Sequence, residues 1–375
     1  MRQIFYQTKN ISGMILVLSP LLGSAAAHWP FFFYLILLAG AACALPLSCA
    51  ALQHLPFRIW RRLSALSACL ALLLLSLTVS RPLQNPAILW GGAFLLGISC
   101  SRLLLLFPPL VAVGWYRRSP AAALGILWSG SFLLLPFWRF LLHTAPGFFF
   151  CAASVCLLTG LFGFLRQPPV DCRRLENPMT QGRTGIFARP SLFTGAISAS
   201  LGMGLAMVLR ADQTDSPMAG RILSPAIPLI FCLALAAGSL FTARFIERKG
   251  IFSGCILLLF LCESAAACLG NPDRPLLSAA GLYLLAGAAG SVPVILPVLT
   301  LYLYGIIAYP QNLCRLLFFF PAGLLCALPF CYLALEGQLA AEEPAVFLLF
   351  LLVGSFFCIF SAWKHRFIIL KNRIL

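Results

Sequence analysis

The stretch RQPPVDCRRLENPMTQGRTGIFARP, residues 166–190, divides this chain into two parts. It contains five Arg, four Pro and two Gly, and its few apolar residues do not recur at helical spacing. So long a polar stretch stands out, because 61% of the 375 residues are hydrophobic and only 10% are charged. The stretch therefore predicts a water-exposed linker between two apolar halves.

The composition of the chain excludes most classes of protein. A soluble domain has about 25% charged and about 45–50% apolar residues, whereas this chain has a mean hydropathy of +0.97. Folded in water it would expose large apolar patches, and it is too rich in aromatic residues to be disordered. Its apolar stretches are continuous rather than alternating, so we expect an integral membrane protein built of helices rather than a β-barrel.

Twelve apolar stretches approach the roughly 20 residues that a helix needs to cross about 30 Å of hydrocarbon. Six precede the linker and six follow it, which predicts an all-α membrane fold of two six-helix bundles, 1–165 and 191–375, joined by the linker 166–190. The first stretch also has features of a secretory signal, but the count of six per half favours a retained span. The predicted spans are 11–27, 31–52, 63–79, 87–115, 120–143, 147–165, 191–209, 222–241, 251–269, 276–307, 313–335 and 345–363.

Two of these spans contain prolines that predict kinks or tilt. The span 87–115 contains Pro108 and Pro109, and the span 276–307 contains Pro293 and Pro297.

The basic residues predict the orientation of the spans. If the amino terminus is placed in the cytoplasm, twenty of the 26 Lys and Arg fall on the cytoplasmic side, with Arg315 counted there at the cytoplasmic end of its span, four fall outside and two lie deeper within spans. This distribution follows the positive-inside rule and predicts a cell-membrane protein with both termini in the cytoplasm. The net charge of +16 is therefore interpreted as a topology signal, and no nucleic-acid partner is expected.

Two short cytoplasmic loops carry basic residues at corresponding places in the two halves. The first loop, FRIWRR, is residues 57–62, and the second, ARFIERKG, is residues 243–250. Any cytoplasmic loop collects Arg to hold topology, but the recurrence favours a duplicated fold. The residues concerned, which are candidates for gating loops, are Arg58, Arg61, Arg62, Arg244, Arg248 and Lys249.

These loops resemble the signature Gly-x-x-x-Asp-Arg-x-Gly-Arg-Arg/Lys of the major facilitator superfamily. The stretch PPLVAVGWYRRSPAAALGILWSGSFLLLP, residues 108–136, is similar to that family's pattern of an aromatic, one or two Arg, a small-residue run with Gly, and a later Gly and Pro. The resemblance implies two six-helix bundles that rock about a midplane site, with spans one, four, seven and ten lining the cavity.

The chain departs from the family signature where the signature has its Asp. Phe57 stands at that place in the first loop and Ala243 in the second, while Gln53 and Ser239 stand where Gly is expected. In the family that Asp takes part in a gating contact on the cytoplasmic side, so the resemblance implies that ordinary gating by this contact is not expected here. This erosion motivates the alternative of a sensor or assembly module that keeps the fold but does not transport.

Three charged residues lie well inside the predicted spans, where a charge is costly and is a functional candidate. Arg102 lies about halfway along the fourth span, and its guanidinium either clamps an anion or pairs with backbone carbonyls near the prolines. Arg139 lies near the outer end of the fifth span and can extend its side chain outward. Glu263 is the one intramembrane carboxylate, predicted either to pack helices or to carry a proton. Arg139 and Glu263 are the candidates for coupling.

Spans seven and ten supply the other candidate binding residues. Ser198 and Tyr283 are the candidates, and both lie among small residues whose spacing also suits close helix packing. Packing and substrate contact therefore remain alternatives for each of them.

The motifs that the chain lacks narrow its function further. It contains no Walker loop, no GxSxG, no HExxH and no CxxC pair among its fifteen Cys, so we expect no enzyme activity, no cofactor and no metal site. We expect a secondary transporter of a small organic anion or amphipathic compound, with the lipid bilayer and one small solute as partners and a monomeric state.

Overall fold

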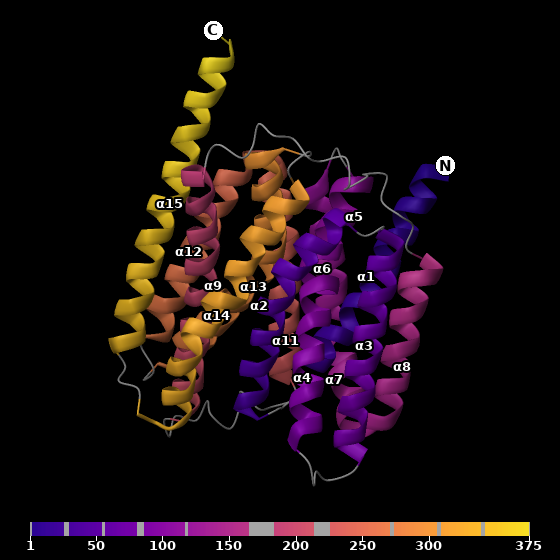
Figure 1. The fold of residues 1–375 in the computed structure, drawn as a ribbon. Helices are drawn as coiled ribbons and strands as arrows, with labels where there is room; N and C mark the ends of the chain where they lie inside the picture. The colour runs from indigo at the N-terminus through magenta and orange to yellow at the C-terminus, as the bar shows by residue number, and fades with distance from the viewer. Residues whose placement is uncertain are drawn as a thin grey trace. The chain divides into compact units, whose positions relative to one another are not determined.

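Every regular element that the computed structural model describes is a helix. The structure describes residues 2–25, 30–54, 57–80, 86–116, 119–164, 184–213, 226–270, 274–305, 309–338 and 342–374. The chain divides into two compact units, Met1–Glu176 and Asn177–Leu375, each with its own set of long helices (Figure 1). Most of the predicted linker lies outside the described residues.

The first unit contains six helical rods, some made of more than one element. The first three rods are single helices. The fourth and sixth each include a π-helical segment, and the fifth is interrupted at Leu134. In order, the elements are α1 (Arg2–Ala25), α2 (Phe31–His54), α3 (Phe57–Ser80), α4 (Pro86–Cys100) with η1 (Ser101–Leu106) and α5 (Phe107–Trp115), α6 (Pro120–Leu133) with α7 (Leu135–Thr144), and α8 (Pro146–Leu158) with η2 (Thr159–Phe164).

The second unit also contains six rods in its described residues, each of them a single α-helix. They are α9 (Thr184–Gln213), α11 (Ala226–Lys249), α12 (Ile251–Leu269), α13 (Pro275–Tyr304), α14 (Tyr309–Leu335) and α15 (Glu342–Ile374).

Several helices extend beyond the apolar stretches that predicted them. α3 begins at Phe57 rather than at residue 63, and α9 begins at Thr184 within the predicted linker. A helix continues past the hydrocarbon because its backbone hydrogen bonds do not depend on lipid, and arginine stems reach water from its end. Hydropathy therefore marks the membrane segment of a helix, and the helix itself is longer.

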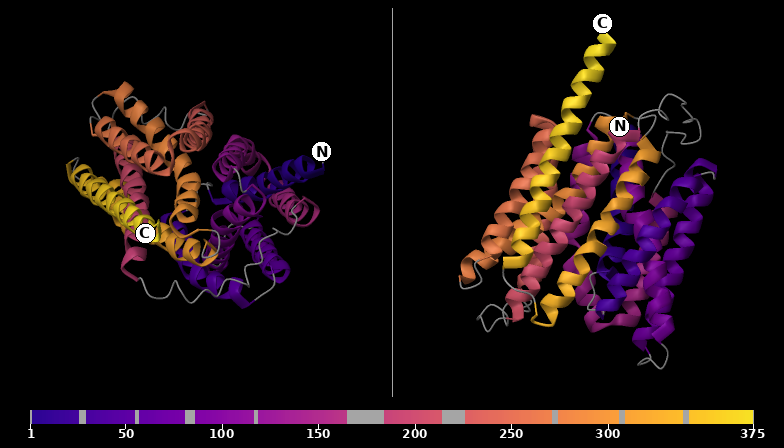
Figure 2. Two further views of the ribbon diagram at one scale, coloured as in Figure 1. Left: turned by 90° about the horizontal axis from the view of Figure 1, so that it is seen from above. Right: turned by 60° about the vertical axis from the view of Figure 1, so that its left-hand side comes forward.

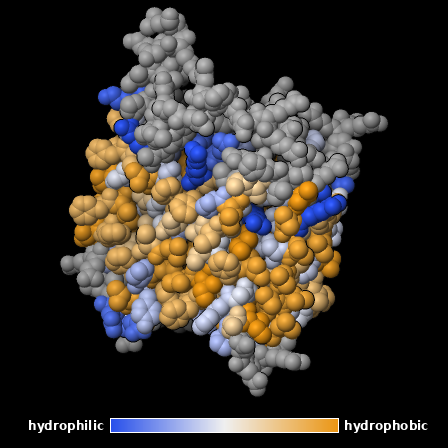
Figure 3. Space-filling model, in the orientation of Figure 1, coloured by the Kyte–Doolittle hydropathy of each residue, from blue (hydrophilic) through white to orange (hydrophobic). Residues whose placement is uncertain are grey.

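Ten of the described rods are long and apolar enough to cross a membrane. α1 is not among these ten, and α15 contributes a shorter apolar segment, Val346–Ser361. Apolar side chains cover much of the molecular face in Figure 3, and polar ones lie mainly toward its upper and lower edges. The protein is an all-helical, multi-pass membrane protein.

The two units pack their rods in the same order. In the first unit α4 lies against α2 and α3, while α1 lies against α6, α7 and η2. In the second unit α13 lies against α11 and α12, while α9 lies against α14 and α15. Viewed end on, each unit is a bundle (Figure 2, left). The repeated order is what a duplicated six-helix fold produces.

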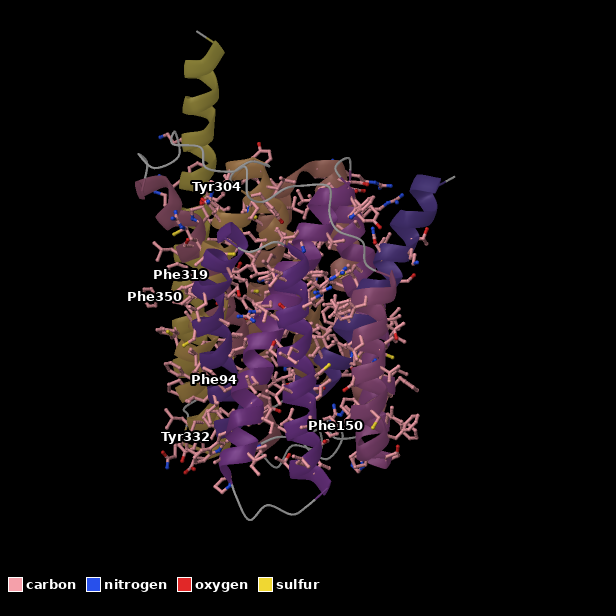
Figure 4. The ribbon with its side chains drawn as sticks, turned by 45° about the vertical axis from the view of Figure 1, so that its right-hand side comes forward. Phe94, Phe150, Tyr304, Phe319, Tyr332 and Phe350 are labelled. Carbon is pink, nitrogen blue, oxygen red and sulfur yellow. The ribbon has the colours of Figure 1, made fainter. Side chains whose placement is uncertain are left out.

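Glycine fixes the same close helix crossing in both units. A Cβ on Gly97 of α4 would overlap the carbonyl oxygen of Leu37 on α2, and one on Gly40 would overlap that of Phe94, which Figure 4 labels. Leu37 and Gly40 are three residues apart on one helix, as are Phe94 and Gly97 on the other. Only glycine permits two backbones to approach this closely.

The crossing of α11 and α13 repeats this arrangement with the same spacing. Gly290 meets the carbonyl oxygen of Leu235, and Gly238 meets that of Gly287. Polar side chains strengthen the second crossing, because the hydroxyls of Thr242 and Ser291 lie 2.7 Å apart.

The two proline-containing spans differ in how they accommodate the prolines. Pro108 and Pro109 lie in the first turn of α5, separated by Phe107 from the end of the π-helix η1, so the regular α-helix is interrupted just before them. α13, in contrast, remains α-helical through Pro293 and Pro297. The expected distortion is thus expressed as a π-helix in the first unit.

Candidate functional site

Arg102 lies in η1, near the middle of the candidate span Pro86–Trp115. Proline has no N–H, so Pro108 and Pro109 cannot donate to the carbonyls of Leu104 and Leu105, four residues earlier. The N–H of Phe107 donates instead to the carbonyl of Arg102, five residues earlier. The two missing N–H groups are consistent with a π-helix at the residue that carries the charge, and such segments are frequent at functional sites.

The side chain of Arg102 is held from α2. Its Nε donates a hydrogen bond of 3.2 Å to Oγ of Ser48, which is fully buried. A guanidinium has five N–H donors, so this bond engages one and leaves the four on the two Nη atoms. A hydrogen bond to a charged group contributes about 1.5–3 kcal/mol. Ser48 therefore orients a half-buried cation through Nε alone, and its Nη donors have no hydrogen-bond partner among the described residues.

No carboxylate of the first bundle can neutralise Arg102. Residues 1–170 contain no Asp or Glu, and the first acidic residue is Asp171 in the linker stretch. Within the described residues, Ser48 is the hydrogen-bond partner of Arg102 and no ion pair is formed. A charge at this depth is expensive without a partner. The site therefore has a fixed positive charge that a bound anion would compensate.

Ser198 lies where α9 meets α14. Its hydroxyl lies 3.0 Å from the carbonyl oxygen of Gly195 and 3.3 Å from that of Phe319, which Figure 4 labels. A Cβ on Gly323 of α14 would overlap the Ser198 hydroxyl. The structure thus places Ser198 in a tight helix contact, with its hydroxyl bonded to backbone.

Tyr283 lies half-buried on α13 and is not brought together with Ser198. α9 approaches α13 where Gly204 faces the side chain of Leu285. Ser198 precedes Gly204 by six residues, which is about 9 Å along the helix. The two candidates thus lie at different levels of the second unit, and Arg102 belongs to the first unit.

The two coupling candidates lie in different surroundings. Glu263 is exposed on α12, on the same face as Ile256 and Phe260, whose side chains are 53% and 62% exposed. Arg139 is half-buried on α7, the helix that resumes after the interruption at Leu134.

The basic loop residues fall on opposite sides of their turns. Arg244, Arg248 and Lys249 belong to the last turns of α11, where their charges suit the negative end of the helix dipole. Gly250 then turns the chain with a φ of 88°, which favours glycine. All three are exposed.

The corresponding residues of the first half belong to the start of the next helix. Arg58, Arg61 and Arg62 are in the first turns of α3, where the helix dipole opposes positive charge. The guanidinium of Arg61 lies 5.2 Å from the ring centre of Phe162 in η2, and Arg62 is exposed. The side chain of Arg58 lies outside the described residues. The two basic clusters therefore lie in different helices relative to their turns, one before the turn and one after it.

Two features of the Arg102 site have no direct sequence signal. Ser48 is one of many hydroxyl residues in apolar helices, and it lies 54 positions from Arg102. The pair Pro108–Pro109 predicts a distortion but not its type. In the described part of the chain, no three His, Cys, Asp or Glu side chains come together to hold a metal ion.

The fold defines the class of protein. The described residues form two units of six rods with one repeated packing order, the arrangement of a multi-pass membrane protein with the major facilitator fold. No family model and no curated protein matches the sequence.

Two solved structures carry this comparison. The crystal structure of the human organic anion transporter MFSD10 (TETRAN) is similar with a TM-score of 0.67 at 15% identity, and the match covers 95% of this chain and 100% of that chain. The crystal structure of a bacterial homologue of iron transporter ferroportin, in the outward-facing state, is similar with a TM-score of 0.63 at 14% identity, covering 96% of this chain and 98% of that one. At these identities the likeness establishes the fold, and it confirms the resemblance to the major facilitator superfamily at that level.

Proposed function

We propose that this protein is a secondary transporter that carries a small organic anion by alternating access, with Arg102 as the counter-charge in the site. The observation that carries the proposal is the uncompensated guanidinium: it is half-buried in a membrane helix, oriented by Ser48, and accompanied by no carboxylate in residues 1–170. A planar guanidinium suits carboxylate, sulfonate and phosphate groups, which it binds in a bidentate manner.

The structural neighbours support a transport function, but the charge of the solute has to be inferred from the residues of this chain. One is named for organic anions and the other for iron, so the fold alone serves solutes of both signs. A bundle that has an unpaired arginine and no acidic residue repels cations and attracts anions. The anion is therefore the solute that fits this site.

The proposal also covers the topology, the oligomeric state and the other candidate residues. All twelve rods cross the cell membrane, with both termini in the cytoplasm, because this orientation puts twenty basic residues inside and four outside. The protein works as a monomer in the bilayer, has no catalytic activity and binds no nucleic acid. Ser198 and Tyr283 remain candidate contacts for the solute from the second unit, and the basic loop residues remain candidates in gating.

A second candidate function is a sensor of the same fold that binds an anion without transporting it. The observation that favours it is the replacement of the signature Asp by Phe57 and Ala243. Cysteine accessibility from both sides of the membrane separates the two functions, because a carrier exposes its site to each side in turn and a locked sensor does not.

The binding claim is tested by thermal unfolding of the purified protein. Benzoate, benzenesulfonate and phenyl phosphate are compared with neutral benzyl alcohol and cationic benzylamine. A ligand at about 100 times its Kd stabilises the folded state by about 2.7 kcal/mol. We expect at least one anion to raise the Tm of the wild type and of R274Q, which loses an exposed arginine, but not that of R102Q. Equal stabilisation of R102Q, or stabilisation by the cation alone, would overturn the proposal.

A further inference from the structure

The charge of Arg102 is permanent throughout any transport cycle. A guanidinium does not lose its proton at physiological pH. Ser48, its hydrogen-bond partner, offers a dipole and not a charge. Whatever compensates Arg102 must therefore arrive and leave with the solute.

An empty carrier would have to move this bare charge through a closed state. Alternating access requires a state in which the site is shut off from water on both sides, and a charge removed from water without a partner is costly. When an anion occupies the site, the pair is neutral and the penalty largely disappears. The loaded carrier thus reorients readily, and the empty carrier does not.

From this asymmetry we infer that the protein is an obligate exchanger, which returns across the membrane only after binding a second anion on the far side. The inference rests on the proposed function and adds its mode of coupling. It means that the solute gradient of one anion drives the movement of another, with no net charge moved when the two anions carry equal charge.

The alternative to exchange is net uptake driven by a proton, and Glu263 is the candidate residue for carrying that proton. A coupling carboxylate has to face the solute pathway alternately from each side. Glu263 instead shares its exposed face of α12 with Ile256 and Phe260, which are 53% and 62% exposed. A carboxylate on the exposed face of its bundle does not line a pathway within that bundle, so we expect exchange to proceed without it.

The test uses the full chain in proteoliposomes with labelled benzenesulfonate outside. A sulfonate stays ionised and does not leak across lipid as a neutral acid. The vesicles contain potassium chloride, with or without unlabelled benzenesulfonate. Each is assayed with a protonophore, and with a potassium diffusion potential set by valinomycin.

We expect internal benzenesulfonate to speed uptake by about tenfold or more, which corresponds to about 1.4 kcal/mol of barrier. We also expect this uptake to be indifferent to protonophore and to potential, and E263Q to leave its rate within about twofold of the wild type. Equal uptake without internal benzenesulfonate would overturn the exchange inference while leaving transport intact. Uptake driven by the potential, or abolished by protonophore and by E263Q, would do the same. If the reconstituted wild-type protein is folded, as judged by its Tm, and takes up the anion in none of these conditions, the proposed function is overturned together with this inference.

Discussion

The hydroxyl of Ser48 is the smallest feature on which the anion site depends. It accepts a hydrogen bond of 3.2 Å from Nε of Arg102 and so sets which edge of the guanidinium faces an incoming anion. In S48A the cation keeps its charge but loses this orientation, so we expect the Kd for the stabilising anion to rise about tenfold, as for the loss of about 1.4 kcal/mol. Anion titrations followed by thermal unfolding measure this change.

Ser64 provides the matched control for Ser48. Its hydroxyl is also buried, but it donates to the carbonyl of Trp60 on its own helix α3. S64A should therefore keep the wild-type Kd. If S48A and S64A bind the anion equally well, Ser48 does not position Arg102.

The sequence was sufficient to single out Arg102, because a charge in the middle of an apolar stretch is visible without a structure. Ser48 could not be found this way. Hydroxyl residues are common in membrane helices, where most donate to their own backbone, as Ser24 does to Pro20. Choosing the one that reaches Arg102 needs the pairing of α2 with η1, which is a tertiary fact.

The π-helix η1 is the element that aims Arg102. Restoring both N–H groups in the double variant P108A/P109A gives the carbonyls of Leu104 and Leu105 their α-helical donors. We expect the segment to become α-helical and to turn Arg102 away from Ser48. The Tm without ligand should then be equal or higher, while the anion no longer raises it.

P293A is the control for this variant, because α13 is already α-helical around its prolines. It should leave the anion response unchanged. An unchanged response in P108A/P109A as well would show that the π-helix does not aim the arginine.

The glycine crossings test the duplicated architecture. In G290A the new methyl group overlaps the carbonyl oxygen of Leu235, whereas in G287A, on the same helix α13, nothing lies within 4 Å of it. Overpacking costs about 1–3 kcal/mol, so we expect G290A to lower the Tm by several degrees and G287A to leave it unchanged.

The first unit offers the same comparison. G97A should destabilise, because of the carbonyl of Leu37, and G91A on the same helix α4 should not. If G97A and G290A are both as stable as their controls, the helices are not as close as described.

The number and order of the rods follow from hydropathy, because crossing hydrocarbon imposes a minimum apolar length on each helix. The positions of the helix ends do not follow from hydropathy, because α3 and α9 extend past their apolar stretches. The two basic loops looked alike in sequence because both hold arginines at a spacing of four, yet one set ends α11 and the other begins α3. Only the position of the turn, which the structure provides, shows that the two sets of arginines lie in different helices.

The orientation of the whole chain in the membrane gives a further prediction. The excess of basic residues on one side of the proposed spans predicts that both termini lie in the cytoplasm. Green fluorescent protein fused to either end should fluoresce in bacterial cells, and alkaline phosphatase fused to the same ends should be inactive. Active phosphatase at either terminus would reverse the topology.

Uptake of labelled benzenesulfonate into proteoliposomes preloaded with the unlabelled anion measures the role of Arg102 in transport. We predict rapid uptake by the wild type and by R274Q, partial uptake by R102K, which keeps the charge but loses the planar fork, and none above protein-free vesicles by R102Q. Wild-type uptake by R102Q at a normal protein level would show that Arg102 is not the counter-charge for a transported anion.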